Sequence, residues 1–204
     1  MKYKSILFDL DGCLIDATNW HYEALNRALK LFGYSINPED HIKVFNGLPT
    51  SEKLKMMSEK GDLPYALHDI IKTAKKLYTR DEIKKRCKPD YSKIIMLKTL
   101  KNKGLKLACC SNAIQESVED MLTSAGIIEY FDLILGNDQG FKPKPEPDIY
   151  LEAMRRLDLK PEECLIVEDA PPGIQSAKAS GGTVIEVKGY SDVHLGLFEK
   201  YLQS

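Results

Sequence analysis

The sequence predicts a three-layer α/β/α protein, with a parallel sheet between two layers of helices and a helical subdomain inserted near the start. Two observations support this fold class. Five short apolar runs lie at 5–9, 105–110, 132–136, 164–169 and 183–187, and helical patterns separate the later ones. About seventy residues after the first run contain no comparable strand, although a simple crossover needs only about a dozen.

The apolar runs are typical of strands that are covered on both faces. SILFD (5–9) and CLIVED (164–169) show little alternation of polar and apolar residues, as expected for buried parallel strands. The accompanying helical patterns lie at 91–104, 114–126, 147–159 and 171–181. Strands that alternate with helices of this length indicate a parallel sheet. The last segment, 193–202, is expected to form a helix that packs on this core through Leu195, Leu197, Phe198 and Leu202.

The residues after the first run form a separate, helical part of the chain. We expect helices over 17–33, 50–61 and 64–86, and we place the core at 1–15 and 90–204 and the inserted cap at 16–89. The first helix carries an apolar side made of Trp20, Ala24, Ala28, Leu31 and Phe32. Trp20 is expected in the core of the cap in preference to a substrate platform. The lysines of 72–88 are expected to form a solvated helix face, with a rim that steers anions as the alternative.

Composition indicates a globular protein and names no macromolecular partner. The 204 residues are 43% hydrophobic, and the net charge is -1 with a pI near 6.4, which gives no basic footprint for nucleic acid. No stretch approaches the roughly 20 apolar residues of a membrane span, and no signal peptide is visible. We therefore expect a cytoplasmic monomer. The five cysteines are expected to be small buried hydrophobes, with a metal site or disulfides as the alternative.

Polar residues follow four of the predicted strands. Asp9 and Asp11 come at the end of the first strand, directly before Gly12, which allows a sharp turn. Further along the chain, three more polar features come after later strands: Ser111 with Asn112, Lys144, and Glu168 with Asp169. Because the carboxyl ends of parallel strands meet at one edge of a sheet, these side chains are expected to converge on one crevice.

The predicted cluster suits magnesium-dependent phosphoryl transfer. Asp9, Asp169 and Glu168, with the main-chain carbonyl of Asp11, offer the oxygen ligands that Mg²⁺ prefers. Asp9 is assigned as the nucleophile that forms an aspartyl phosphate, and Asp11 as the acid and base. Ser111 and Lys144 would bind the phosphoryl oxygens.

Several of these residues have a second interpretation. Asp169 and Ser111 could each cap the helix that follows. Glu168 could either belong to the metal shell or make a structural hydrogen bond, and the sequence favours neither role. Lys142 competes with Lys144 for the phosphate, and the spacing of the segment KPEPD favours Lys144.

The four segments DLDG (9–12), SN (111–112), KPEPD (144–148) and VEDAPPG (167–173) resemble the four motifs of the haloacid dehalogenase superfamily, in its helical-cap branch. Within it, the chain looks most like the β-phosphoglucomutase-like phosphatases and mutases. The resemblance implies a Rossmann-like core, a mobile cap, Mg²⁺ and an aspartyl phosphate. Asp11 and Asp169 argue against dehalogenase chemistry, whose members lack the second aspartate and the metal.

The cap decides the substrate in this branch, and the resemblance extends to some of its residues. His21 and the loop around Gly47 are expected to contact the substrate, as are Gly12 and Asn112 at the core, with a surface position as the alternative for His21. Where related mutases place an arginine, this chain reads Pro49, Thr50 and Ser51, and Ala17 replaces a hydroxyl residue. These departures favour hydrolysis of a small phosphorylated metabolite, such as a sugar phosphate. A phosphomutase is the alternative, and a receiver-like signalling module is a remote one.

Overall fold

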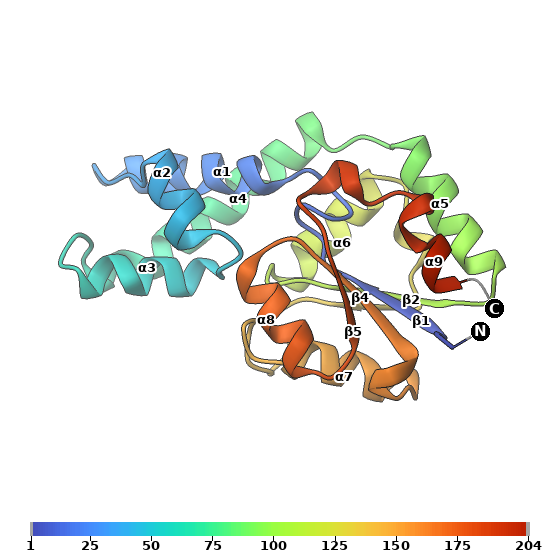
Figure 1. Ribbon diagram of the computed structural model, residues 1–204. Helices are drawn as coiled ribbons and strands as arrows, with labels where there is room; N and C mark the ends of the chain where they lie inside the picture. Colours follow the sequence, from blue (N-terminus) through green and yellow to red (C-terminus); the bar gives the residue numbers. More distant parts are fainter. Residues whose placement is uncertain (1, 203–204) are drawn as a thin grey trace.

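The computed structural model describes residues 2–202 as two lobes, which Figure 1 shows side by side. The larger lobe is built round a sheet, and the smaller lobe consists of helices. The chain enters the helical lobe after the first strand and returns to the sheet lobe at α5. The architecture is the predicted one, a three-layer α/β/α core with an inserted helical cap. The exact limits given above for the two parts stay a prediction.

Five parallel strands form the sheet in the order β3-β2-β1-β4-β5. They are β1 (Ser5–Phe8), β2 (Lys106–Cys110), β3 (Leu133–Leu135), β4 (Cys164–Glu168) and β5 (Thr183–Glu186). All five predicted strands are present. β1 is central, because Ser5 pairs with Lys106 on one side and with Cys164 on the other. The carboxyl ends of β2, β1 and β4 therefore lie next to one another.

Helices cover both faces of the sheet (Figure 1). α5 (Tyr91–Asn102) and α6 (Gln115–Ser124) lie on one face, and α7 (Asp148–Leu157) and α8 (Pro171–Ala179) lie on the other. Single turns of 3₁₀ helix precede β3, β4 and the last segment, namely η3 (Ile128–Tyr130), η4 (Pro161–Glu163) and η5 (Tyr190–Asp192).

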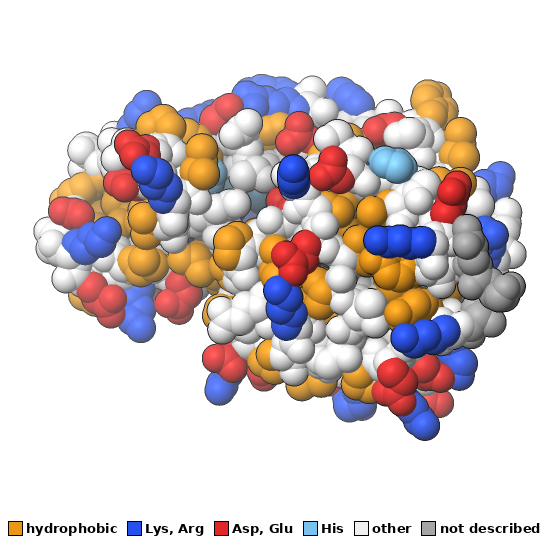
Figure 2. All heavy atoms as spheres, in the orientation of Figure 1, with side chains coloured by type: hydrophobic (Ala, Val, Ile, Leu, Met, Phe, Trp, Pro, Cys, Tyr) orange, Lys and Arg blue, Asp and Glu red, His pale blue; other side chains and the backbone are white. Residues whose placement is uncertain are grey.

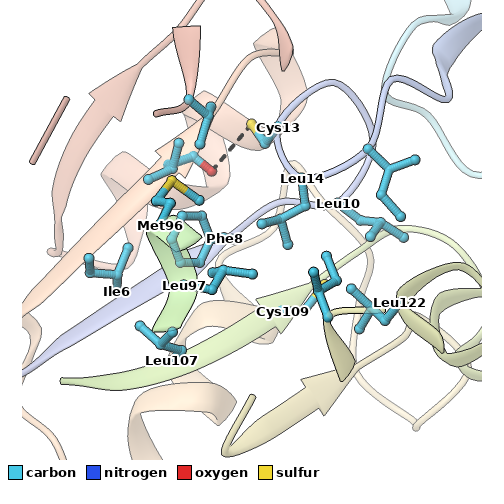
Figure 3. Close-up of a cluster of buried hydrophobic side chains, with 14 of the residues drawn as sticks. Ile6, Phe8, Leu10, Cys13, Leu14, Met96, Leu97, Leu107, Cys109 and Leu122 are labelled. Carbon is cyan, nitrogen blue, oxygen red and sulfur yellow. Dashed lines mark hydrogen bonds between the residues drawn. The ribbon is translucent and has the colours of Figure 1, made fainter. Parts of the chain in front are cut away.

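The central strand explains why the predicted strands read as unbroken apolar runs. Ile6 and Phe8 point into the cluster that α5 and α6 cover, and Leu7 points into the cluster under α7 and α8. All three side chains are fully buried. Figure 3 shows Phe8 beside Met96 and Leu97 of α5. Truncation of such a side chain to alanine costs about 3–5 kcal/mol, so the sheet that positions the site is firmly held.

The end of the chain differs from the prediction of one helix over 193–202. The structure has a 3₁₀ turn, η6 (Leu195–Phe198), followed by the short α9 (Glu199–Leu202). Gly196 lies inside this segment, and glycine disfavours a continuous α-helix by about 1 kcal/mol. The predicted packing is nevertheless present, because Phe198 is fully buried, and its neighbours Leu195, Leu197 and Leu202 contact the same cluster.

The cap is helical throughout and has an apolar cluster of its own. Its elements are α1 (Thr18–Lys30), α2 (Pro38–Asp40), the π-helical turn η1 (His41–Phe45), α3 (Thr50–Glu59), η2 (Tyr65–Leu67) and α4 (His68–Arg86). Leu25 and Leu29 of α1 pack with Leu54 of α3 and Ile71 of α4. The cap therefore folds round its own core and can carry side chains to the sheet edge.

Two expectations for the first cap helix are wrong. Trp20 does not join the cap cluster; it packs against the main core, whose cluster also contains Ile83 and Cys87 at the far end of α4. Its position near the start of α1 leaves it at the junction of the two lobes. Leu31 is 58% exposed, because α1 ends at Lys30 and Leu31 lies beyond its last turn.

The surface agrees with the balanced composition. Figure 2 shows acidic and basic side chains interspersed over this face of both lobes. None of the helices between residues 2 and 202 combines the length and apolar character that crossing a membrane requires. The five cysteines are buried and free of disulfides, as expected.

Candidate active site

The candidate site begins where β1 ends. The amide of Asp9 donates to Val167 O of β4 at 3.0 Å, so the backbone of Asp9 still belongs to the sheet edge. The chain then turns at Gly12, whose φ is +86°. A Cβ atom at Gly12 would lie 2.1 Å from Oδ2 of Asp169, so a side chain here would displace the Asp169 carboxylate. Glycine is therefore required here both by the backbone and by the approach of Asp169.

Lys144 lies at the centre of the buried charges. Its Nζ donates to Asp9 Oδ1 at 2.7 Å, to Glu168 Oε1 at 2.6 Å and to Cys110 O at 2.8 Å. The side chain is 3% exposed, whereas Lys142 is exposed. Burial by itself would lower the pKa of Lys144, but Asp9 and Glu168 raise it well above the ordinary value. The structure thus brings Lys144, and not Lys142, to the site as a permanent cation.

Asp9 is a carboxylate in an environment that resists its charge. Burial and the neighbouring Glu168 raise the pKa of Asp9 well above its ordinary value, and Lys144 opposes them. Lys144 holds Oδ1, while Oδ2 accepts no hydrogen bond from residues 2–202. One oxygen of the predicted nucleophile is therefore fixed, and the other is free of protein donors.

The oxygen ligands at the site fit a divalent cation. Ligand atoms of Asp9, Cys13 and Asp169 lie within 4.8 Å of one another. Oδ1 of Asp169 is buried without a hydrogen-bond partner in the described part of the chain, and burial followed by repulsion from Glu168 raises the pKa of Asp169 to about 6. A buried carboxylate oxygen of this kind is the ligand that Mg²⁺ takes. Burial also raises the pKa of Cys13, so its thiol stays neutral and is a poor ligand for this hard cation.

Glu168, beside these ligands, is held by hydrogen bonds within the protein. Its Oε1 accepts from Lys144 at 2.6 Å and from the Tyr150 hydroxyl at 2.5 Å. A Cβ at Gly173 would lie 2.1 Å from the Glu168 carboxyl carbon, so α8 packs directly on this side chain. Of the two roles left open by the sequence, the contacts favour the structural one, in which Glu168 orients Lys144.

The second aspartate has a different partner. Oδ1 of Asp11 lies 3.0 Å from Nε2 of His21, which α1 of the cap supplies. On the other side of the same imidazole, Nδ1 lies 3.4 Å from Nζ of Lys75 on α4. Burial would raise the pKa of Asp11, but His21, Lys75 and Lys144 together outweigh burial and lower the pKa. Asp9 and Asp11 therefore face different environments.

Ser111 and Asn112 follow β2. Ser111 is 1% exposed, and its Oγ accepts from the amide of Ala113 at 3.0 Å. The Asn112 side chain joins two loops, because Nδ2 donates to Gly47 O at 2.9 Å and Oδ1 accepts from the Lys144 amide at 2.9 Å. Asn112 thus fixes the cap loop to the core. Its predicted contact with a phosphate stays a prediction, as does that of Ser111.

A cavity of about 550 Å³ lies between core and cap, and all the predicted site residues except Gly12 line it. Gly47 lies where the cap loop meets the core: a Cβ there would be 3.0 Å from that of Ala170. Pro49, Thr50 and Ser51 face the same cavity. A volume of this size accommodates a small metabolite together with its phosphate.

The cap side of this cavity also contains residues that the sequence does not single out. Four polar ones are His41, Lys53, Lys75 and Thr79. Lys75 lies among the lysines of 72–88 that are predicted to be solvated, and His41 begins a π-helical turn that no pattern predicted. Lys75 and Thr79 are four residues apart on α4 and so share a helix face. Ile71, one turn earlier on the same face, is apolar. This spacing is the sequence signal that could have indicated that Lys75 and Thr79 face the interior of the cap.

Comparison with known proteins relates this arrangement to a family. The family described as haloacid dehalogenase-like hydrolase matches residues 6–187. A phosphoglycolate phosphatase from Nitrosospira multiformis is 32% identical over 199 residues, which cover 94% of this chain and 86% of that protein. The bifunctional riboflavin kinase/FMN phosphatase of Arabidopsis thaliana is 31% identical over 183 residues, 89% of this chain. The match covers 48% of the plant protein, so this chain spans about half its length.

A solved structure agrees with the sequence comparison. CbbY from Rhodobacter sphaeroides, in complex with phosphate, is similar to this chain with a TM-score of 0.82 at 26% identity, over 92% of this chain and 87% of that one. The inserted helices and the family match are at odds with the receiver-like alternative. The chain belongs to the haloacid dehalogenase-like hydrolases, and it is a hydrolytic enzyme of their helical-cap branch.

Proposed function

We propose that this protein is a Mg²⁺-dependent phosphatase that hydrolyses a small phosphorylated metabolite, such as a sugar phosphate, through an aspartyl phosphate on Asp9. The observation that carries the proposal is the convergence of Asp9, Lys144 and Asp169 at one sheet edge, with Asp11 and His21 beside them. Relatives named phosphatases agree with this activity.

Asp9 is the nucleophile in this proposal. Lys144 holds Oδ1 at 2.7 Å and leaves Oδ2 free to attack phosphorus. The buried ammonium also opposes the burial that raises the pKa of Asp9. The P–O bond to the leaving alcohol breaks as the bond from Oδ2 forms, and Lys144 with Ser111 offsets charge on the phosphoryl oxygens.

Asp11 carries the proton in both steps. A phosphate dianion entering the cavity would raise the pKa of Asp11 by like-charge repulsion, so that the protonated carboxyl can donate to the leaving oxygen. His21, at 3.0 Å from Oδ1, orients the carboxyl group. Asp11 then takes a proton from water, which attacks phosphorus and releases phosphate and Asp9.

Mg²⁺ would be held by carboxylate oxygens of Asp9 and Asp169 and by the main-chain carbonyl of Asp11. When bound, the ion supplies positive charge that offsets the charge of the phosphoryl group and of the carboxylates. The buried, unpartnered Oδ1 of Asp169 supports this assignment.

Hydrolysis is proposed in preference to phosphoryl return to a second hydroxyl. The cap loop presents Pro49, Thr50 and Ser51 to the cavity where related mutases place an arginine.

Phosphate release from a panel of phosphate monoesters, with Mg²⁺ and with EDTA, tests the proposal. Asp9→Asn keeps the shape of the side chain but removes the nucleophile, and we expect its rate to fall at least about 1,000-fold. Circular dichroism of the same sample checks that the variant folds. Release that persists in Asp9→Asn, or that is indifferent to EDTA, would refute the assignment. Consumption of a sugar 1-phosphate without phosphate release would instead establish the mutase.

A further inference from the structure

The cap wall of the active-site cavity carries a group of polar side chains that the chemistry at Asp9 does not use. Lys53 comes from α3, Lys75 and Thr79 come from α4, and His41 begins η1. All four line the cavity that also contains Asp9 and Asp11. Lys53, His41 and Thr79 are 8%, 5% and 2% exposed, so they are built into the wall and do not extend into solvent.

Lys53 differs from the other deeply buried lysines of the described chain. Lys144 donates to two carboxylates and a carbonyl, and Lys93 donates to the main-chain oxygens of Tyr190 and Val193. Nζ of Lys53 makes no hydrogen bond or ion pair within residues 2–202, and the one hydrogen bond of Lys75 Nζ there is to the imidazole of His21. Burial, followed by repulsion from Lys75, lowers the pKa of Lys53 to about 8. Asp11 is the carboxylate whose attraction opposes these effects at both lysines, but it makes no hydrogen bond to either, and a buried cation without an anion in direct contact is costly.

The two neutral groups beside these lysines also lack partners. Nε2 of His41 and Oγ1 of Thr79 are buried without a hydrogen bond in the described part of the chain. Burial lowers the pKa of His41 to about 4, so the imidazole is neutral and can donate one N–H. Two ammonium groups, an imidazole and a hydroxyl together form a set of donors suited to anionic oxygen atoms.

We propose that Lys53, Lys75, His41 and Thr79 bind a second anionic group of the substrate. The substrate class is then a phosphate monoester whose leaving alcohol carries a carboxylate or a second phosphate. This inference rests on the proposed function for its first phosphate, which Asp9 and Lys144 receive. The two anionic groups lie at opposite walls of one cavity of about 550 Å³, so a compact substrate spans them.

Calorimetric titration with matched, non-hydrolysable phosphonates tests the second subsite without turnover. One pair is 3-phosphonopropionate and its amide, which lacks the carboxylate charge. The other is propane-1,3-bisphosphonate and propylphosphonate, which lacks the second phosphonate. In each pair, the member with two anionic groups is called the charged member and the other the uncharged member. All titrations use the full chain with excess Mg²⁺. A charge-assisted contact with a buried anion is worth about a 10- to 150-fold change in Kd. We expect the charged member of one pair to bind more tightly by about that factor, and the pair that shows it identifies carboxylate or phosphate.

Three variants locate the effect. The preference is the ratio of the two Kd values within a pair. In Lys53→Met this ratio should fall toward one, and Thr79→Val should reduce it about threefold to tenfold. Lys55→Met is the matched control on the same helix, because Lys55 is exposed and pairs only with Glu59, at 3.9 Å; it should keep the full preference.

Equal Kd values within both pairs would overturn the inference, as would a Lys53→Met effect of the same size on charged and uncharged members. The test also separates the two proposals. If the preference is present but no phosphate monoester is hydrolysed, the proposed function fails and the anion subsite stands. If phosphate is released but neither pair shows a preference, the phosphatase stands and the second subsite fails.

Discussion

Replacement of Lys53 by methionine should stabilise the free protein. Methionine keeps the unbranched stem in the 8% exposed position but removes the buried charge. A pKa near 8, in place of the ordinary 10.5, corresponds to about 3 kcal/mol of unfavourable free energy for the charged lysine at neutral pH. We therefore expect Lys53→Met to raise the free energy of unfolding by about 2–3 kcal/mol at pH 7. Residues that are kept for binding often lower the stability of the free protein, so their replacement raises it.

Urea denaturation across pH measures this gain and its cause. The lowered pKa makes the penalty complete below pH 8, where Lys53 is charged in both states. Between about pH 8 and 10.5 the folded state loses its proton first, so the wild type regains stability and the advantage of the variant should shrink. Lys55→Met, the exposed control, should change the free energy of unfolding by less than about 0.5 kcal/mol. A loss of stability in Lys53→Met, or a gain that does not change with pH, would refute the reasoning.

Two further predictions concern the metal side of the site. Saturating Mg²⁺ should raise Tm by about 5–10 °C, because binding at 100 times Kd contributes about 2.7 kcal/mol; Asp169→Asn should abolish this shift in a thermal scan, and a variant that keeps it would exclude Asp169 as a ligand. Gly12→Ala forces φ of +86° on alanine and places Cβ 2.1 Å from Asp169 Oδ2. It should lower the unfolding free energy by about 1–3 kcal/mol and weaken the Mg²⁺ shift, whereas wild-type values for both would show that the turn can relax.

The sheet and its edge were predictable because their signals are local. Ile6, Leu7 and Phe8 are buried on both faces of the sheet, and a strand covered on both faces has to be apolar throughout. Polar residues directly after such a run must lie at the edge. The parallel order then brings Asp9 and Asp169 together without any knowledge of side-chain direction.

Side-chain direction is what the sequence could not provide. Glu168 and Asp169 are neighbours, yet Glu168 turns to Lys144 while Asp169 keeps an unpartnered oxygen at the site. Trp20 appeared to belong to the cap and packs on the main core. In both cases the packing of a distant element decides the outcome: α8 at Gly173 fixes Glu168, and the end of α4 receives Trp20. A pattern of spacing within one segment holds no information about such contacts.

The cap lysines were missed for a related reason, and the reason bears on how the enzyme is built. A lysine inside a lysine-rich helix reads as solvated, because solvation is where lysine is most stable. The fold overrides that preference at Lys53 and Lys75, and it places them opposite the carboxylates of the core. The core wall thus carries negative charge that Lys144 offsets in part, and the cap wall carries positive charge that we propose a ligand offsets. The residues proposed to break the phosphate bond and those proposed to recognise the rest of the substrate therefore belong to different lobes. Because the cap wall has little part in the chemistry, its residues can change to accept a different leaving group while Asp9, Lys144 and Asp169 keep the same arrangement.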